Sequence, residues 1–153
     1  MVRLRVRCFI GAPREAVWDV LADLERQGEW MVDVRRLAIV SDARRGVGTV
    51  LHVTSELFGL PLVRDVMEIT HWEPPTRMDV AHRGQFHGTG SFQLDSVANG
   101  TIFVWTEDVA PPLGRIGEVA FALAVRPHLT RVFRRSMANV ARLASARAAT
   151  RGA

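Results

Sequence analysis

A chain of 153 residues with an apolar fraction of 48% and a charged fraction of 24% has the size and composition of one globular domain, which excludes a disordered or fibrous protein. No apolar run approaches the roughly twenty residues of a membrane-spanning helix. The net charge of +4 comes from twenty basic residues that are all arginine and are dispersed along the chain, which argues against a nucleic-acid-binding face. We therefore expect a single domain over residues 1–153, with no nucleic-acid partner and no transmembrane segment.

The N-terminal residues predict a strand followed by two short helices. Residues 2–10 alternate arginine with apolar side chains, a strand pattern without the apolar block of a signal peptide, so we expect the protein to be cytoplasmic. Cys8, the single cysteine, falls on the apolar face of this strand and has no partner for an internal disulfide. In residues 12–30, Pro13 suits a first helical position, apolar residues follow at three- and four-residue spacing, and a second, shorter helix ends at Trp30.

Turn residues divide the middle of the chain into six further strands. Asn99-Gly100, between two alternating runs, is a strong hairpin signal, and Pro74-Pro75 marks another turn. Connections this short join antiparallel neighbours, because a parallel crossover needs about a dozen residues or more. The predicted strands are 34–41, 48–58, 62–72, 76–82, 86–96 and 101–109.

A long helix is predicted from Ile116 to about Ala149, with an apolar stripe on one side and arginines on the other. Pro127 removes the hydrogen bond to the carbonyl of Leu123 and should kink the helix axis. The segment before Pro127 is apolar on nearly all sides, so we expect it to cover an apolar interior with one face and to be partly buried on the other. The order of elements predicts an α+β fold, in which a seven-stranded curved antiparallel sheet and two short helices are closed by the long C-terminal helix.

Alternation along the strands places three ionisable side chains on the inner face of the sheet: Asp65, His82 and Glu107. An acid or base in an apolar cavity has a shifted pKa and can exchange a proton with a bound molecule. These three residues are our candidate catalytic groups. The structural alternative is that they reach water at strand ends or form ion pairs with arginines such as Arg64 and Arg77.

The sequence carries no other catalytic or cofactor signature. Ser55 and Ser91 have no visible histidine–aspartate arrangement of the kind that activates a hydrolase serine. Metal-binding motifs such as HExxH or a cysteine–histidine cluster do not occur. Gly88 and Gly90 lie inside a predicted strand and open no helix, so we expect them to mark a bulge or to leave room for a ligand against the sheet rather than to bind phosphate. We expect no metal and no cofactor.

Five motifs along the chain resemble those of the START-like superfamily (SRPBCC), which includes polyketide cyclases/dehydrases and lipid-transport proteins. They are APREAVWDVLADLERQGEW (12–30), GVGT (46–49), HWEPPTRMDV (71–80), GTGSFQL (88–94) and NGTIFVWTEDV (99–109). The resemblance covers nearly the whole chain and implies the helix-grip fold, in which apolar molecules bind between the sheet and the long helix. Members include carriers of lipids and quinones as well as cyclases and aromatases, so the fold does not determine the function.

The resemblance and the inward-facing positions together lead to two functional hypotheses. The first is a carrier or binding protein for an apolar small molecule of the lipid, quinone or polyketide type, with transient membrane contact left open. The second is a polyketide cyclase or aromatase that uses Asp65, His82 and Glu107. A weaker third is a protein-binding role with a nearly filled cavity, and both a monomer and a homodimer remain open. The expected ligand-binding residues are Ser55, Met67, Met78, Val80, Phe86, Phe92, Phe103, Trp105, Phe121 and Val125.

Overall fold

A computed structural model describes residues 1–152 and shows a curved seven-stranded antiparallel sheet in the order β1-β7-β6-β5-β4-β3-β2. The predicted fold class is confirmed. Each strand boundary lies within two residues of its predicted position, because the hairpin turns are marked in the sequence. The strands are β1 (Val2–Ile10), β2 (Val34–Ile39), β3 (Val50–Leu57), β4 (Leu60–Glu73), β5 (Arg77–Arg83), β6 (His87–Val97) and β7 (Gly100–Ala110).

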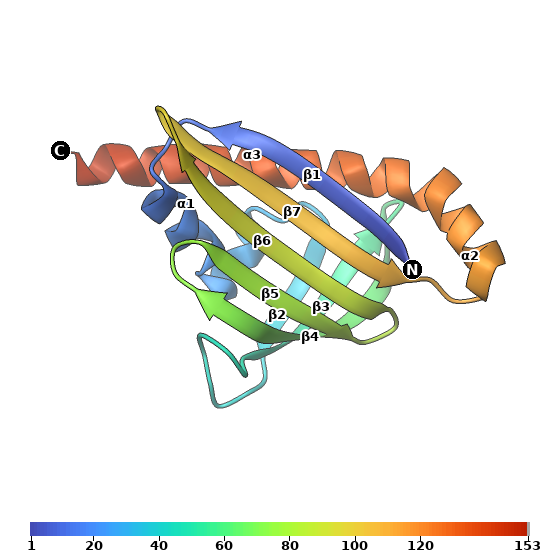
Figure 1. Cartoon of the computed structure of the whole chain (residues 1–153). Helices are drawn as coiled ribbons and strands as arrows, with labels where there is room; N and C mark the ends of the chain where they lie inside the picture. Colours follow the sequence, from blue (N-terminus) through green and yellow to red (C-terminus); the bar gives the residue numbers. More distant parts are fainter. Residues whose placement is uncertain (153) are drawn as a thin grey trace.

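The helices lie on the concave face and at the ends of the sheet (Figure 1). The first pair follows β1, and the C-terminal series runs along the length of the sheet, so that the two termini lie at opposite ends of the molecule. None of the helices in the described part of the chain is long and apolar enough to cross a membrane. The helices are α1 (Arg14–Leu21), η1 (Leu24–Glu29), α2 (Gly114–Ala120), η2 (Phe121–Val125) and α3 (Arg126–Arg151).

The helix pair after β1 closes one end of the curved sheet. Pro13 stands one position before α1, where its carbonyl accepts hydrogen bonds from the N–H groups of Ala16 and Val17. This differs by one residue from the predicted first helical position, and the proline again has no N–H to leave unpaired. Val17 and Leu21 are completely buried under α3, so the predicted apolar face of this helix is confirmed.

The C-terminal helix is interrupted where Pro127 predicts a break. Pro127 occupies the first turn of α3, and the preceding residues 121–125 form a π-helical turn in which the N–H of Arg126 donates to the carbonyl of Phe121. Because proline has no N–H to give to Leu123, the wider turn accommodates the missing donor. Beyond this point α3 buries Phe133, Met137 and its following apolar residues against the sheet.

Aromatic side chains fill the end of the interior nearest the helix pair. Trp30 makes edge-to-face contacts with Phe92 and Trp105, with ring centroids 5.9 and 5.8 Å apart, and Phe92 makes the same kind of contact with Phe103 at 5.6 Å. Trp30 and Phe103 are almost fully buried. This cluster makes one half of the interior solid. The other half, under η2 and the start of α3, is hollow.

Candidate functional site

A cavity of about 170 Å³ lies between the concave face of the sheet and the C-terminal helices, and it is partly open to solvent. Its volume corresponds to roughly six water molecules at the ~30 Å³ that each occupies in the liquid. Apolar side chains from β3 to β7 form most of its wall, and helical residues close it. The helical residues are Gln27 and Met31 near η1, and Phe121, Val125, Leu129 and Phe133 in η2 and α3.

Nearly all the ligand-binding residues expected from the sequence line this cavity. Ser55, Met67, Met78, Val80, Phe86, Phe92, Trp105, Phe121 and Val125 all contribute to its wall. Phe103 is the exception, because it lies completely buried in the solid aromatic cluster against Phe92. Strand alternation correctly predicts that Phe103 faces inward. The inner face of a strand includes both solid core and cavity wall, however, and periodicity does not distinguish the two.

One aromatic surface of the cavity is held flat by stacking. Trp105 on β7 lies parallel to Phe133 of α3, with ring centroids 3.9 Å apart and an interplanar angle of 6°. Trp105 also meets Phe92 edge to face at 5.1 Å. These contacts fix the indole between the sheet and the helix, so the cavity wall near Trp105 is rigid. Trp72 is not part of the cavity wall and packs edge to face on Trp18.

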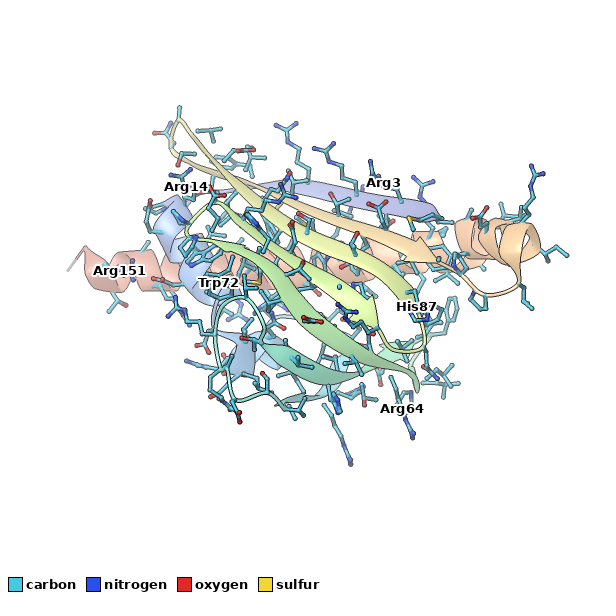
Figure 2. The ribbon with its side chains drawn as sticks, turned by 60° about the horizontal axis from the view of Figure 1, so that its bottom comes forward. Arg3, Arg14, Arg64, Trp72, His87 and Arg151 are labelled. Carbon is cyan, nitrogen blue, oxygen red and sulfur yellow. The ribbon has the colours of Figure 1, made fainter. Side chains whose placement is uncertain are left out.

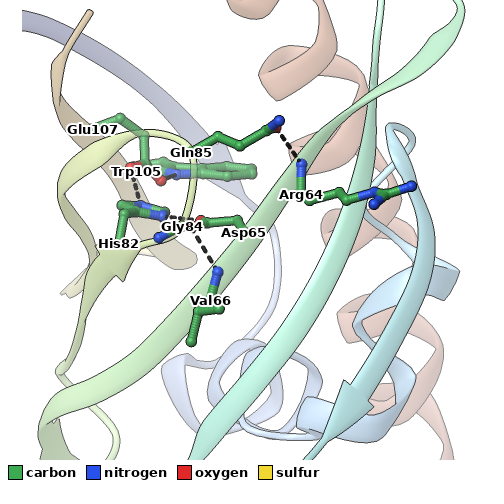
Figure 3. A network of polar contacts seen from close by, with 8 residues as sticks. All are labelled: Arg64, Asp65, Val66, His82, Gly84, Gln85, Trp105 and Glu107. Carbon is green, nitrogen blue, oxygen red and sulfur yellow. Dashed lines mark hydrogen bonds and ion pairs between the residues drawn. The ribbon is translucent and has the colours of Figure 1, made fainter. Parts of the chain in front are cut away.

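The three candidate catalytic residues form one hydrogen-bonded cluster (Figure 3). His82 lies between the two carboxylates, with Nδ1 2.5 Å from Asp65 Oδ2 and Nε2 2.8 Å from Glu107 Oε2. The side chains are 12–14% exposed, and all three residues line the cavity. The three residues come from β4, β5 and β7, so neighbouring and next-but-one strands of the sheet bring them together.

Glycines make the cluster sterically feasible. Gly90 on β6 pairs with Glu107 in the sheet, and a Cβ at Gly90 would lie 2.8 Å from Glu107 Oε1. The absent side chain therefore leaves the path by which Glu107 reaches across β6 to His82. Gly84 approaches Asp65 just as closely, and its N–H donates to Asp65 Oδ1 at 3.1 Å. The pairing of β5, β6 and β7 shows no bulge at Gly90, and the space that this glycine leaves is taken by the Glu107 side chain.

Further donors hold the two carboxylates in place. The N–H of Val66 donates to Asp65 Oδ1 at 2.8 Å, and the indole N–H of Trp105 donates to Glu107 Oε1 at 2.8 Å. Each carboxylate is therefore fixed by one oxygen while its other oxygen holds His82. This arrangement orients the imidazole ring and leaves neither ring nitrogen free.

The cluster holds His82 in its charged form. Burial alone would lower the pKa of His82, but the hydrogen bonds and negative charges of Asp65 and Glu107 outweigh it and raise the pKa to about 10. The cluster thus places an imidazolium between two carboxylates on the wall of an apolar cavity. His82 can donate a proton in this state but cannot accept one.

The arginines considered as alternative partners take no part in the cluster. The Arg64 side chain points away from His82 (Figure 3), and Arg77 pairs with Asp79 on the same strand at 2.7 Å. Only the backbone near Arg64 supports the site, through its N–H, which donates to the side-chain oxygen of Gln85 at 2.8 Å. The structural alternative of ion pairs with arginine is therefore wrong for these three residues.

Four further polar residues of the cavity wall were missed from the sequence: Gln27, Asp33, Glu56 and Ser91. Asp33 stands just before β2, and burial raises its pKa, partly offset by its backbone N–H and by Ser55, while Glu107 and Glu56 raise it further by their charge. Gln27 of η1 is 3% exposed, and its side-chain oxygen has no hydrogen-bond partner among the described residues. Asp33 occupies a predicted connection and Gln27 a predicted helix, so strand alternation gave no signal for either residue. In the part of the chain described here, no group of three or more histidine, cysteine, aspartate or glutamate side chains is arranged to hold a metal ion.

The fold is that of a helix-grip protein, with an internal cavity between the sheet and the C-terminal helices. The chain belongs to the family described as polyketide cyclase / dehydrase and lipid transport, whose model matches residues 1–145. The predicted superfamily is therefore confirmed. No curated protein matches the sequence.

Solved structures support the same fold at low sequence identity. The protein TTHA0849 from Thermus thermophilus is 22% identical, with a TM-score of 0.80 over 95% of this chain and 98% of that one. DR_A0006 from Deinococcus radiodurans is 18% identical, with a TM-score of 0.66 over 92% and 95% of the two chains. An Aha1 dimer from Colwellia psychrerythraea is 18% identical, with a TM-score of 0.59 over 87% and 91%. Similarity at this level establishes the architecture.

Proposed function

We propose that the protein binds an apolar small molecule of the lipid, quinone or polyketide type in the cavity between the sheet and α3. The observation that carries this proposal is a cavity walled mainly by methionine, valine and aromatic side chains, with its polar groups confined to a few positions. Removing an apolar molecule from water into such a wall is favourable by about 25 cal/mol for each Å² buried. The polar groups would orient the molecule, as in other small-molecule sites.

Native mass spectrometry after gentle purification tests the binding function. We expect a co-purifying apolar molecule of defined mass on the wild-type protein and its loss from Phe92→Asp, which puts a charge into the cavity wall. Val40→Asp is the matched control, because Val40 is 51% exposed outside the cavity. Circular dichroism confirms that each variant is folded. A wild-type protein that retains no molecule and binds no added fatty acid, quinone or polyketide would contradict the proposal.

The polar cluster supports a second candidate function, a polyketide cyclase or aromatase. The cavity wall includes Asp33, Asp65, His82 and Glu107. A bound molecule would therefore lie against acidic groups in different protonation states. Glu107 is held beside a cation, and Asp33 retains its proton to higher pH than an ordinary carboxyl group because it is buried. A carboxylate held beside a cation and a buried carboxyl group that keeps its proton are suited to opposite roles in acid–base catalysis.

A cyclisation at this site would form one carbon–carbon bond and move one proton on to the bound molecule for each proton taken from it. The Glu107 carboxylate takes a proton from the carbon between two carbonyls of a bound poly-β-keto chain. The resulting enolate carbon forms a bond to a second carbonyl carbon, whose oxygen receives a proton from Asp33 or His82. Glu107 then releases its proton to solvent, and the residue that donated a proton takes one up from solvent, so both groups return to their starting states. Holding the two carbons together in the cavity would supply a large part of the acceleration.

A synthetic poly-β-keto thioester tests the enzymatic function. We expect Asp65→Asn, His82→Gln and Glu107→Gln each to lower the rate of cyclised product formation about a hundredfold or more while leaving affinity near that of the wild type. Tryptophan fluorescence measures the affinity independently, since Trp105 lies in the cavity wall. Unchanged turnover in all three variants would leave the protein as a carrier only.

A further inference from the structure

The helix segment before Pro127 carries an apolar face that the rest of the protein leaves uncovered. Leu113, Ile116, Val119 and Leu123 recur at three- and four-residue intervals, and they are 82%, 78%, 59% and 76% exposed. No residue of α2 is buried. We call these four side chains the α2 apolar face. A contiguous exposed face of large aliphatic residues is a mark of an interaction surface rather than of a solvated helix.

A second exposed apolar group lies at the tip of the β3–β4 hairpin. Phe58, Leu60 and Leu62 are each 54–57% exposed. The ring of Phe58 lies against His128 in the first turn of α3, with ring centroids 4.5 Å apart. The backbone N–H of Phe58 donates to His128 Nε2 at 3.3 Å. The hairpin tip is therefore fixed beside the junction of η2 and α3, close in space to the C-terminal end of the α2 apolar face.

Both apolar groups have arginines close in sequence that form no ion pair within the described residues. Arg115 stands between Leu113 and Ile116, Arg126 follows Leu123 by three residues, and Arg64 follows Leu62 at the next outward position of β4. All three are exposed, and none lies within ion-pair distance of a carboxylate. Figure 2 shows Arg64 at the periphery of the molecule, beyond the edge of the ribbon. The apolar groups are thus bordered by uncompensated positive charge.

The same elements lead directly into the cavity. Phe121 and Val125 lie on η2, on either side of Leu123, and both line the cavity. On the other side, Leu57 and Val63 flank the hairpin tip in sequence and line the cavity as well. The outward side chains of these two segments are therefore exposed to an external surface while their inward neighbours face the ligand space.

We propose that the α2 apolar face and the hairpin tip dock on an anionic lipid bilayer, with the aliphatic side chains in the acyl–headgroup boundary and Arg64, Arg115 and Arg126 at the lipid phosphates. Amphipathic surfaces of this composition bind membranes through buried apolar area together with attraction to anionic lipids. A second copy of the chain is a poorer occupant, because self-association through this surface would bring the unpaired arginines of both copies together. Docking would place the cavity mouth against acyl chains, so an apolar ligand could enter without crossing water.

Vesicle co-sedimentation tests the proposal with the full chain. We expect binding to phosphatidylcholine vesicles that contain phosphatidylglycerol, weak binding to phosphatidylcholine alone, and loss of binding as salt is raised. The double variant Ile116→Asp/Leu123→Asp should lower the partition coefficient at least about tenfold. Its matched control is Val40→Asp/Val47→Asp, which adds the same charge at positions 51% and 62% exposed in the loop between β2 and β3.

Arginine variants separately test how much the positive charges contribute to vesicle binding. Arg115→Gln/Arg126→Gln should weaken binding by about fivefold for each charge removed, on the basis of about 1 kcal/mol per basic residue at an anionic surface. Arg36→Gln/Arg142→Gln removes the same charge from exposed positions away from the docking surface and should have a smaller effect. Equal binding to neutral vesicles, equal losses in the control variants, or no vesicle binding would overturn the proposal. So would concentration-dependent dimerisation that Ile116→Asp abolishes, because the surface would then bind a second copy.

Discussion

A buried imidazolium held between two carboxylates is the main polar feature of the protein, and its proton couples stability to pH. The pKa of His82 is about 10 in the folded chain, against about 6.5 for an ordinary histidine, so folding binds this proton more tightly. The stabilisation is complete below about pH 6.5 and is lost as pH rises toward 10. Its size is about 3–5 kcal/mol.

Urea unfolding of the wild type and His82→Gln over a pH series measures this contribution. We expect the wild type to be the more stable protein at neutral pH, and the difference to shrink between about pH 6.5 and 10, the window between the pKa of His82 in the unfolded and in the folded chain. His52→Gln, a matched change at an exposed histidine, serves as control. A difference that stays constant over this range, or an imidazole of His82 that titrates by NMR near pH 6.5, would show that the carboxylates do not hold the proton.

Gly90 gives a second prediction at the residue scale. In Gly90→Ala the new Cβ would meet Glu107 Oε1 at 2.8 Å and Val80 Cγ2 at 2.9 Å, so the Glu107 carboxylate must move away from His82. We expect a lower pKa for His82 by NMR titration and a loss of about 1–3 kcal/mol in the free energy of unfolding. Gly28→Ala is the control, because a Cβ there makes only an ordinary contact at 3.8 Å. An unchanged His82 titration in Gly90→Ala would refute the steric argument.

Residue-level reasoning from the sequence found the members of the cluster but not their pairing. Strand alternation is sufficient to predict that Asp65, His82 and Glu107 face inward, since a buried face fixes the register of each strand. It does not determine that Glu107 reaches His82 across β6, because that depends on strand order and on the absent side chain of Gly90. Asp33 stands outside any strand, so no periodicity could mark it.

At the scale of elements, α2 differs from α3 in how it is held. The helix α2 buries no residue, whereas α3 buries Phe133, Met137 and Val140 against the sheet. Local opening is easiest where few apolar contacts hold an element, so α2 should unfold locally without disturbing α3. We therefore expect the amide protons of residues 117–120 to exchange with solvent at least about a hundredfold faster than those of residues 137–144.

Hydrogen exchange measured by NMR tests this difference. Exchange in residues 117–120 should slow when phosphatidylglycerol-containing vesicles or nanodiscs are added, because docking orders the helix. Similar protection in both segments of the free protein would contradict the description of α2 as a weakly held element. This test is independent of whether the cavity is occupied.

The boundaries of the elements follow well from the sequence where turn chemistry marks them. Asn99 adopts a positive φ of 65° beside Gly100, as the predicted hairpin requires. Pro127 predicts an interruption of the C-terminal helix, and the structure places a π-turn there. The environment of the segment before Pro127 was predicted less well. Phe121 lies inward as expected, but Ile116 and Val119 are exposed, because the helix extends past the part of the sheet that could cover them (Figure 1).

At the scale of the whole molecule, the protein has a solid half and a hollow half. The aromatic cluster around Trp30 and Phe103 fills one half, and the cavity opens in the other under the start of α3. Membership of the helix-grip family could be predicted from five spaced motifs, because those motifs are the packing residues and turns that build the fold. The volume and polarity of the cavity could not be predicted from the sequence, since they depend on side-chain packing between residues distant in sequence.

Crystallography under xenon pressure tests most directly whether this interior is an apolar void. Xenon enters empty apolar cavities, while a solid or water-filled interior excludes it. In crystals of protein freed of any co-purified molecule, we expect strong xenon density in the cavity, among Met67, Met78, Phe92 and Phe133, and its absence in crystals of Val80→Trp, which would fill that space. Wild-type crystals in which side chains occupy the cavity and no xenon binds would contradict the account.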